Sequence, residues 1–225
     1  MPLLSVIVPV YNEAKTIRQI IEKIHAVNID KEIIVIDNFS TDGTRKILGE
    51  LCYDNLKVIY HSSNRGKGAS FLTGLDNARG EYIVVQDADL EYDPNDYLRL
   101  FEELKDGKYD MVSGARFFEG HQGSFMHVAG NKFLTFVLNS LYGANLNDCA
   151  TCYKLARRDI YQSFKLEKTG FDIDFEIICK ALRKRLKIKE LQVYYHPRSY
   201  NEGKKIRIND AFWATLTMFK YRFWR

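Results

Sequence analysis

The sequence predicts an α/β protein in which helices flank a mostly parallel sheet. Two observations lead to this class: short apolar runs rich in β-branched residues recur through the first half of the chain, and segments with helical spacing of apolar residues lie between them. Strands that alternate with helices favour right-handed βαβ units. The chain has 225 residues, 46% hydrophobic and 28% charged, which is typical of one globular domain and excludes a disordered chain, a collagen-like repeat and a disulfide miniprotein.

The first half supplies the clearest elements. Its first apolar run is interrupted only by Ser5, as expected of a strand buried on both faces. The next segment repeats isoleucine at helical spacing, from Ile17 to Ile24. The pattern predicts strands at residues 3–10, 32–36, 57–60 and 82–85, and helices at residues 13–27, about 42–51 and 68–78.

The second half is less regular. We expect strands at residues 110–114 and 188–195 and helices at residues 131–141 and 175–185. In the first of these helices the inward residues should be Phe133, Phe136, Val137 and Leu141. An amphipathic helix from Asp210 onward should carry on one face Phe212, Leu216, Phe219 and Phe223.

Charge is distributed unevenly. The formal net charge is +4, yet residues 180–225 hold thirteen Lys and Arg against three Asp and Glu, so the rest of the chain is acidic. A basic C-terminal fifth indicates contact with a phosphorylated substrate, an anionic membrane surface or nucleic acid, with a solvated basic face as the alternative. The basic residues are not interleaved with a nucleic-acid-reading motif, so we expect no nucleic-acid partner.

The four cysteines do not form a recognisable zinc or redox motif. Cys149 and Cys152 have C-x-x-C spacing, but no second pair completes a zinc site, so we expect free buried thiols in the reducing cytosol. The start of the chain has no basic n-region, and no apolar run approaches the ~18 residues of a membrane span. We therefore expect neither a signal peptide nor a transmembrane helix.

Polar residues follow three of the predicted strands, where ligands bind in open α/β sheets. They are Pro9 to Glu13, Asp37 with Asn38, and Asp87-Ala88-Asp89. The paired carboxylates Asp87 and Asp89, with Glu91 close behind, supply the hard oxygen ligands that suit Mg²⁺ or Mn²⁺. No G-x-G-x-x-G follows the first strand and no Walker loop is present, which argues against dehydrogenases and P-loop enzymes.

Four segments stand in an order and spacing typical of a known family. They are PVYNE at 9–13, IDNFSTDGT at 36–44, NRGKGAS at 64–70 and QDADLEYDP at 86–94. In these segments the chain resembles the family 2 glycosyltransferases, whose fold is the Rossmann-like GT-A fold. The later segments point to the polyprenyl-phosphate branch, and the resemblance is looser after Arg116. These segments are VSGARF at 112–117, NKFLTFVLNSLYG at 131–143, NDCATCYK at 147–154 and R-x-x-x-EGKKI at 198–206.

The sequence departs from the family in two places. Asn38 stands where the family commonly has a second Asp, and the hydrophobic C-terminal spans of some relatives are absent. The resemblance implies one GT-A domain over residues 1–225. It divides into a nucleotide-binding half at residues 1–110, an acceptor-binding half at 111–205 and an amphipathic basic tail at 206–225.

The resemblance also implies a donor site. A UDP- or GDP-sugar carries a diphosphate whose charge a divalent cation neutralises, and that cation would be held by Asp87, Asp89 and Glu91. The residues implied around the nucleotide are Pro9, Tyr11, Glu13, Asp37, Asn38, Lys67 and Asp87. Asp89 would also take part in catalysis, and transfer with inversion by single displacement is implied.

The acceptor decides which further groups are needed. A polyprenyl phosphate is already an anion and needs cations for positioning. The candidates are Arg116, Lys132, Arg198, Lys204 and Lys205, with Arg116 also counted as catalytic. A sugar hydroxyl instead requires a general base, and Asp174 stands where hydroxyl-using relatives keep theirs. Asp174 is equally suited to cap the following helix.

Two further hypotheses concern partners. A non-catalytic nucleotide-sugar-binding protein is the alternative to an enzyme. The tail, with Trp213, Lys220, Arg222 and Trp224, predicts a peripheral helix at the cytoplasmic face of a membrane, with packing against the domain as the other interpretation. A homo-oligomer or a membrane-protein partner is left open.

Overall fold

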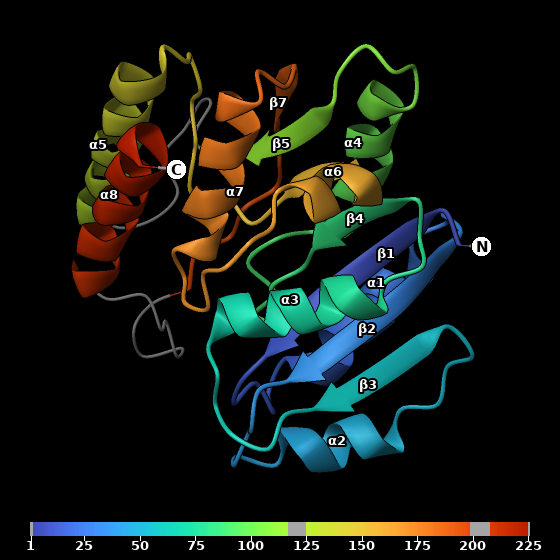
Figure 1. Cartoon of the computed structure of the whole chain (residues 1–225). Helices are drawn as coiled ribbons and strands as arrows, with labels where there is room; N and C mark the ends of the chain where they lie inside the picture. Colours follow the sequence, from blue (N-terminus) through green and yellow to red (C-terminus); the bar gives the residue numbers. More distant parts are fainter. Residues whose placement is uncertain (1, 117–124, 199–207, 225) are drawn as a thin grey trace.

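In the computed structural model one seven-stranded sheet runs through the described residues, which are 2–116, 125–198 and 208–224 (Figure 1). Its strand order is β3-β2-β1-β4-β6-β5-β7. The strands are β1 (Leu4–Val10), β2 (Lys31–Asp37), β3 (Leu56–Tyr60), β4 (Tyr82–Val85), β5 (Met111–Ala115), β6 (Lys154–Arg157) and β7 (Ile188–Gln192). This mostly parallel sheet flanked by helices confirms the predicted fold class.

The parallel half of the sheet is built from the strongest apolar runs. Strands β3, β2, β1 and β4 pair in parallel, so their carboxyl ends meet at one edge. Residues from Val6 to Val8 and from Ile33 to Ile36 are fully buried, because helices cover both faces of these strands. In Figure 1, α3 lies on one face of β1 and β2 and α1 lies behind them.

The helices connect and cover the strands. They are α1 (Ile17–Ala26), α2 (Thr44–Glu50), α3 (Lys67–Asn77), α4 (Asp96–Leu104), α5 (Phe125–Tyr142), α6 (Arg158–Ser163), α7 (Ile173–Arg183) and α8 (Ile208–Phe223). Three elements, α4, α6 and β6, were not expected from the sequence. Strand β6 is antiparallel to both of its neighbours, β4 and β5.

Helices α5, α7 and α8 pack around a second small core, at the left of Figure 1. The expectation that Phe133 and Phe136 face inward is wrong, because they are 62% and 69% exposed. The buried side of α5 instead carries Leu134 and Leu138, while Val137 and Leu141 pack partly against the core. Both sides of α5 are apolar, so helical spacing alone does not identify the buried one.

Helix α8 packs on this core through one side and exposes the other. Ala214, Met218 and Tyr221 are buried. The predicted apolar face of the tail exists but points away from the core, and its exposed residues are Phe212, Leu216, Phe219 and Phe223. Within the described ranges, none of the helices combines the length and apolar character needed to cross a bilayer.

Candidate active site

Arg198 joins the carboxyl ends of β1 and β4. Its Nη1 lies 3.0 Å from Glu13 Oε2, and its Nη2 lies 3.1 Å from Asp89 Oδ2. Both carboxylates are predicted site residues, and Arg198 is a predicted acceptor-phosphate residue from a segment more than a hundred positions away. The structure therefore brings three of these candidates together at the sheet edge where α/β proteins bind ligands.

The loop that carries Glu13 is fixed by the loop after β2. The backbone N–H of Glu13 donates to Thr44 Oγ1 at 2.9 Å, and that of Asn12 donates to Ser40 Oγ at 2.9 Å. Asn12 has a φ of 51°, in the left-handed region that asparagine tolerates better than most residues. These bonds hold Glu13 at the mouth of the sheet, and Pro9 and Tyr11 lie partly buried just before it.

Lys67 forms a second charge network beside the first. Its Nζ lies 2.9 Å from Asp87 Oδ1 and 3.1 Å from Asp174 Oδ2. Burial would lower the pKa of Lys67, but Asp174 and Asp87 raise it well above its usual value, so the ammonium group stays charged. The ion pairs link the start of α3, the end of β4 and the first turn of α7.

Two glycines make this placement of Lys67 feasible. Gly66 has a φ of +90°, and a Cβ there would meet the backbone oxygen of Thr169 at 2.3 Å. A Cβ on Gly68 would meet the backbone oxygen of Lys168 at the same distance. Because glycine alone permits this approach, the start of α3 lies directly against the loop that precedes α7.

Glu91, the third predicted metal ligand, accepts a hydrogen bond on each of its carboxylate oxygens. Its Oε2 accepts a hydrogen bond from Tyr195 Oη at 3.0 Å, and its Oε1 accepts one from the Arg198 backbone N–H at 2.8 Å. In the part of the chain that the structure describes, no three His, Cys, Asp or Glu side chains are grouped to hold a metal ion. Through these two hydrogen bonds, Glu91 fixes the position of the segment that carries Arg198.

The remaining carboxylate pair fits a divalent cation. Burial, Asp87 and Glu91 raise the pKa of Asp89 to about 7, although Arg198 opposes the shift. Burial is the largest cause of this shift, and the two neighbouring carboxylates add to it. Asp87 and Asp89 offer hard oxygen donors, and Mg²⁺ or Mn²⁺ in such sites takes one or two carboxylates and completes its shell with water and substrate phosphate. The donor set therefore matches the predicted cofactor.

Asp37 and Asn38 lie at the end of β2 and are both buried. Asp37 Oδ2 accepts from Arg45 Nε at 2.6 Å, and the Ser40 backbone N–H donates to the same carboxylate. Asn38 Oδ1 accepts from the Arg65 backbone N–H at 2.8 Å. In this arrangement both side chains order the loops around the predicted nucleotide site.

Arg116 is held by a carboxylate that the sequence reasoning did not single out. Its Nε and Nη2 lie 2.7 and 2.9 Å from the two oxygens of Asp148, and Asn131 Nδ2 donates to the same carboxylate. Burial would raise the pKa of Asp148, but Arg116 and Asn131 lower it overall. The Arg116 guanidinium also lies 5.2 Å from the centre of the Tyr195 ring.

The other predicted site residues fall in different places. The cap interpretation of Asp174 is wrong, because Asp172 occupies the cap position of α7 and Asp174 lies in the first turn. The Asp174 carboxylate instead forms an ion pair with Lys67. Lys132 is exposed on α5. Lys204 and Lys205 lie outside the described residues. Lys154, whose Nζ is 4.0 Å from Asp174 Oδ1, was missed, although it ends the NDCATCYK segment that the sequence offered as a signal.

All four cysteines are free, but the expectation that they are buried is wrong for Cys52, which is exposed. Cys149, Cys152 and Cys179 are buried, and burial raises the pKa of the Cys149 thiol to about 12. The C-x-x-C pair is therefore part of the interior, and Cys152 lies near the charges of Asp87, Lys67 and Asp174.

Together, the parallel sheet and the acidic pair at the end of β4 define an α/β domain with a ligand site at the carboxyl ends of its strands. Residues 5–164 match the family described as glycosyl transferase family 2, so the chain belongs to that family.

Curated relatives extend this similarity. The chain is 33% identical over 204 residues to the low-salt glycan biosynthesis hexosyltransferase Agl6 of Haloferax volcanii, covering 88% of this chain and 48% of that protein. It is 29% identical over 171 residues to the dodecaprenyl-phosphate galacturonate synthase of Rhizobium johnstonii, covering 72% and 50%. It is 25% identical over 211 residues to the polyprenol monophosphomannose synthase of Mycolicibacterium smegmatis, covering 88% and 79%. The chain thus spans about half the length of the first two.

Solved structures agree on the fold. Glucosyl-3-phosphoglycerate synthase from Mycobacterium tuberculosis, in complex with Mn²⁺, UDP and glucosyl-3-phosphoglycerate, superposes with a TM-score of 0.75 at 18% identity, covering 98% of this chain and 80% of that one. Its complex with Mg²⁺ and UDP gives a TM-score of 0.73 at 19% identity, covering 98% and 79%. At these identities the likeness is one of fold.

Proposed function

We propose that the chain transfers a hexose from a UDP- or GDP-sugar to a polyprenyl phosphate, with inversion. The observation that carries the proposal is the acidic pair Asp87 and Asp89 at the carboxyl end of β4, bordered by Lys67 on one side and Arg198 on the other. A nucleoside diphosphate needs this combination of a cation-binding pair and fixed positive charge. The names of the two polyprenyl-phosphate relatives support the acceptor class.

Asp87 and Asp89 would hold Mg²⁺ or Mn²⁺, which neutralises the diphosphate and makes it a better leaving group. Lys67 keeps Asp87 in place, and Arg198 keeps Asp89 in place. When the donor binds, its phosphates would offer the side chains of Lys67 and Arg198 a second set of anionic partners within the same site. Pro9, Tyr11 and Glu13 would border the nucleoside, with Asp37 and Asn38 ordering the loops around it.

A phosphate acceptor needs no general base, because it is an anion at neutral pH. What it needs is positive charge beside the sugar, and Arg198, which pairs with Asp89, would supply it. Arg116, held rigidly by Asp148, would support the same side of the site, and Lys132, Lys204 and Lys205 complete the proposed acceptor set.

A hydroxyl acceptor is the second candidate, and one observation favours it. Asp174 shares Lys67 with Asp87, so its carboxylate lies within the candidate site as a general base would. In that reaction Asp174 would accept the proton of the attacking hydroxyl. The ion pair between Lys67 and Asp174 would have to open first, so that the carboxylate is free to act.

A lipid acceptor places the reaction at a membrane, and we propose the cytoplasmic face. The exposed apolar side of α8 suits a helix that lies in the interface. Four free cysteines, three of them buried, would suit a reducing compartment.

Two measurements test the proposal in sequence. Calorimetric titration of UDP and GDP, each with Mn²⁺ and without it, should show metal-dependent binding of one nucleotide. D89A should abolish the metal dependence, whereas D76N, an exposed carboxylate on α3, should not. Transfer of labelled hexose to a polyprenyl phosphate in detergent then tests the acceptor. Nucleotide binding that is identical in D89A, or transfer only to a hydroxyl acceptor, would overturn the corresponding part.

A further inference from the structure

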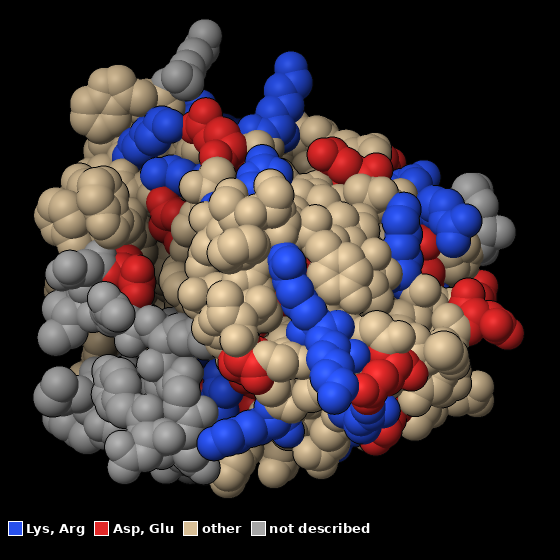
Figure 2. All heavy atoms as spheres, turned by 90° about the horizontal axis from the view of Figure 1, so that it is seen from below, with Lys and Arg blue, Asp and Glu red and all other residues tan. Residues whose placement is uncertain are grey.

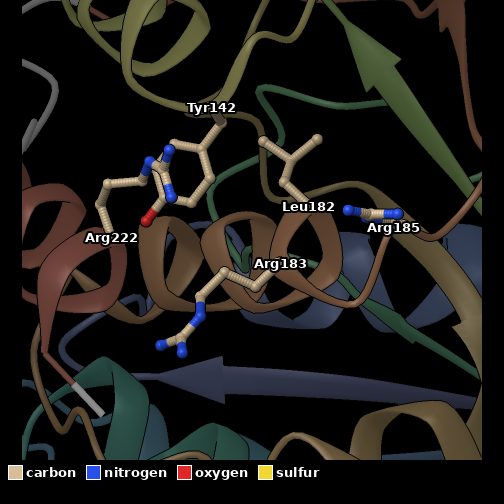
Figure 3. Close-up of a pocket in the computed structure, with 5 residues that line it drawn as sticks. All are labelled: Tyr142, Leu182, Arg183, Arg185 and Arg222. Atoms are coloured by element: carbon tan, nitrogen blue, oxygen red, sulfur yellow. The ribbon is translucent and has the colours of Figure 1, made fainter.

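Three arginines line a pocket of about 370 Å³ at the point where three helices end. Tyr142 is the last residue of α5, Arg183 is the last residue of α7, and Arg222 is the penultimate residue of α8. Leu182 and Arg185 complete the lining (Figure 3). The volume is in the range of small-ligand pockets.

This pocket is separate from the candidate active site. Asp174 lies in the first turn of α7 and Arg183 at its other end, nine residues later. At the rise of an α-helix this separation is about 14 Å along the axis. A ligand in the arginine pocket would therefore not touch Lys67 or Asp174.

Helix termini explain only part of this arrangement. Arg222 Nε donates to the backbone oxygen of Leu141 at 2.6 Å, and Arg183 Nη1 donates to that of Trp224 at 3.3 Å. Such bonds are a common use of arginine near the carbonyl end of a helix. A guanidinium carries five N–H donors, so each arginine keeps further donors for a ligand.

The positive charge of the pocket is not balanced by neighbouring carboxylates. Among residues 2–116, 125–198 and 208–224, Arg183, Arg185 and Arg222 form no ion pair with Asp or Glu, and the Arg185 side chain forms no hydrogen bond. On the face seen from below in Figure 2, by contrast, several basic side chains lie next to acidic ones. Three arginines without a carboxylate partner give the pocket a positive charge that suits an anionic phosphate group.

The pocket borders an exposed aromatic surface. Arg222 lies against the Tyr142 ring, 6.0 Å from its centre (Figure 3). Its guanidinium also lies 5.9 Å from the centre of the Phe223 ring. Phe223 and Trp224 are 63% and 65% exposed, and Phe219 stacks on Phe223. Aromatic side chains next to basic ones are characteristic of proteins that lie in the headgroup layer of a membrane.

We propose that the pocket of Arg183, Arg185 and Arg222 binds the phosphate of an anionic lipid headgroup, while Phe223 and Trp224 lie in the adjoining interface. The inference deepens the proposed function, because a lipid acceptor requires the enzyme at a membrane. The pocket would hold the far end of α7 and α8 to the surface, and thereby set how the active site is presented to it.

Sedimentation of the full chain with sucrose-loaded vesicles tests this without any turnover. The vesicles are phosphatidylcholine alone and phosphatidylcholine mixed with phosphatidylglycerol. The triple variant R183Q/R185Q/R222Q should bind the mixed vesicles about tenfold or more weakly. R183K/R185K/R222K keeps the charge but loses the planar fork, and should bind with intermediate strength. The charge-matched control K23Q/K46Q/K108Q, with three exposed lysines elsewhere, should bind like the wild type.

R185Q alone guards against misfolding, because the Arg185 side chain forms no described bond that its loss would break. It should weaken binding to the mixed vesicles severalfold. Equal binding of the wild type to both vesicle types, or of the glutamine triple variant and the wild type to mixed vesicles, would overturn the inference. The inference would also be overturned if the triple variant lost binding of inorganic phosphate in calorimetry but still bound mixed vesicles like the wild type. Dimerisation of the chain through this surface would overturn it as well. Vesicle binding through the pocket without sugar transfer would refute the proposed function alone.

Discussion

Lys67 and Asp174 form an ion pair of 3.1 Å between the first residue of α3 and the first turn of α7. The same ammonium group reaches Asp87 at 2.9 Å. One lysine thus compensates a candidate metal ligand and a candidate base at once. The three side chains are mostly buried, so their charges depend on each other more than surface charges do.

Replacing Lys67 with methionine should lower the free energy of unfolding by about 3 kcal/mol, because a buried pair that loses one partner leaves uncompensated carboxylates. Urea unfolding at neutral pH measures the change. The double variant K67M/D174N should recover part of the loss, since one of the stranded charges is gone. If K67M unfolded at the same urea concentration as the wild type, the charge network would be too hydrated to contribute to the free energy of unfolding.

Asp174 to asparagine separates the two acceptor classes. With a polyprenyl phosphate as acceptor, kcat should fall less than about tenfold, whereas a general base would cost about 10² or more. Initial rates with labelled nucleotide-sugar and saturating acceptor give the answer. D172N, a change at the cap position of the same helix, is the control for local disturbance. A loss of several hundredfold confined to D174N would favour the hydroxyl acceptor.

The bidentate pair of Arg116 with Asp148 should stabilise the second half of the sheet. Arg116 to leucine leaves Asp148 buried and unpaired, and should cost about 3–5 kcal/mol of unfolding free energy. Arg116 to lysine keeps the charge and should cost less. Chemical denaturation of both variants measures this, and transfer assays add a second readout. If R116K keeps stability but loses transfer, the guanidinium acts on the acceptor directly rather than through Asp148.

The contact between α8 and the loop before α7 should depend on pH. Hydrogen bonds from Lys220 and Tyr221 lower the pKa of Glu167 to about 2 from its ordinary 4.5. The folded-state pKa is depressed, so the contribution to stability is present above pH 4.5 and is lost as pH falls from 4.5 towards 2.

E167Q isolates this contribution. It should unfold at a lower urea concentration than the wild type at neutral pH, and the difference should shrink as the pH is lowered. Because Glu167 is largely exposed, added salt should also reduce the difference. A gap between the two proteins that stays constant down to pH 2 would contradict the assignment.

The sequence was most informative where one physical constraint dominates. Strands β1, β2 and β4 are covered on both faces, so they appear as continuous apolar runs and were predicted within a residue or two. The polar residues that follow them, such as Glu13 and Asp89, were predicted to converge because parallel strands share an edge.

Other features depend on tertiary contacts that no local pattern encodes. Strand β6 is only four residues long, KLAR, and gains its partners from β4 and β5, which lie far from it in sequence. The buried side of α5 is chosen by α7 and α8, because both of its sides are apolar. Glu91 has the right chemistry for a metal ligand. The hydrogen bonds that its carboxylate accepts from Tyr195 and Arg198 could not be predicted from local sequence, because both donors lie more than a hundred residues away.

The position of β6 has a practical consequence for engineering. This strand comes late in the chain yet lies between β4 and β5, so it joins the two halves edge to edge. A chimera that exchanged everything after residue 110 with a relative would have to match a foreign β6 to the native β4. Grafts designed to alter acceptor choice should therefore keep the pairing of β4 with β6, in which Tyr82 is opposite Arg157 and Ile83 is opposite Ala156. They should replace only the loops around these two strands.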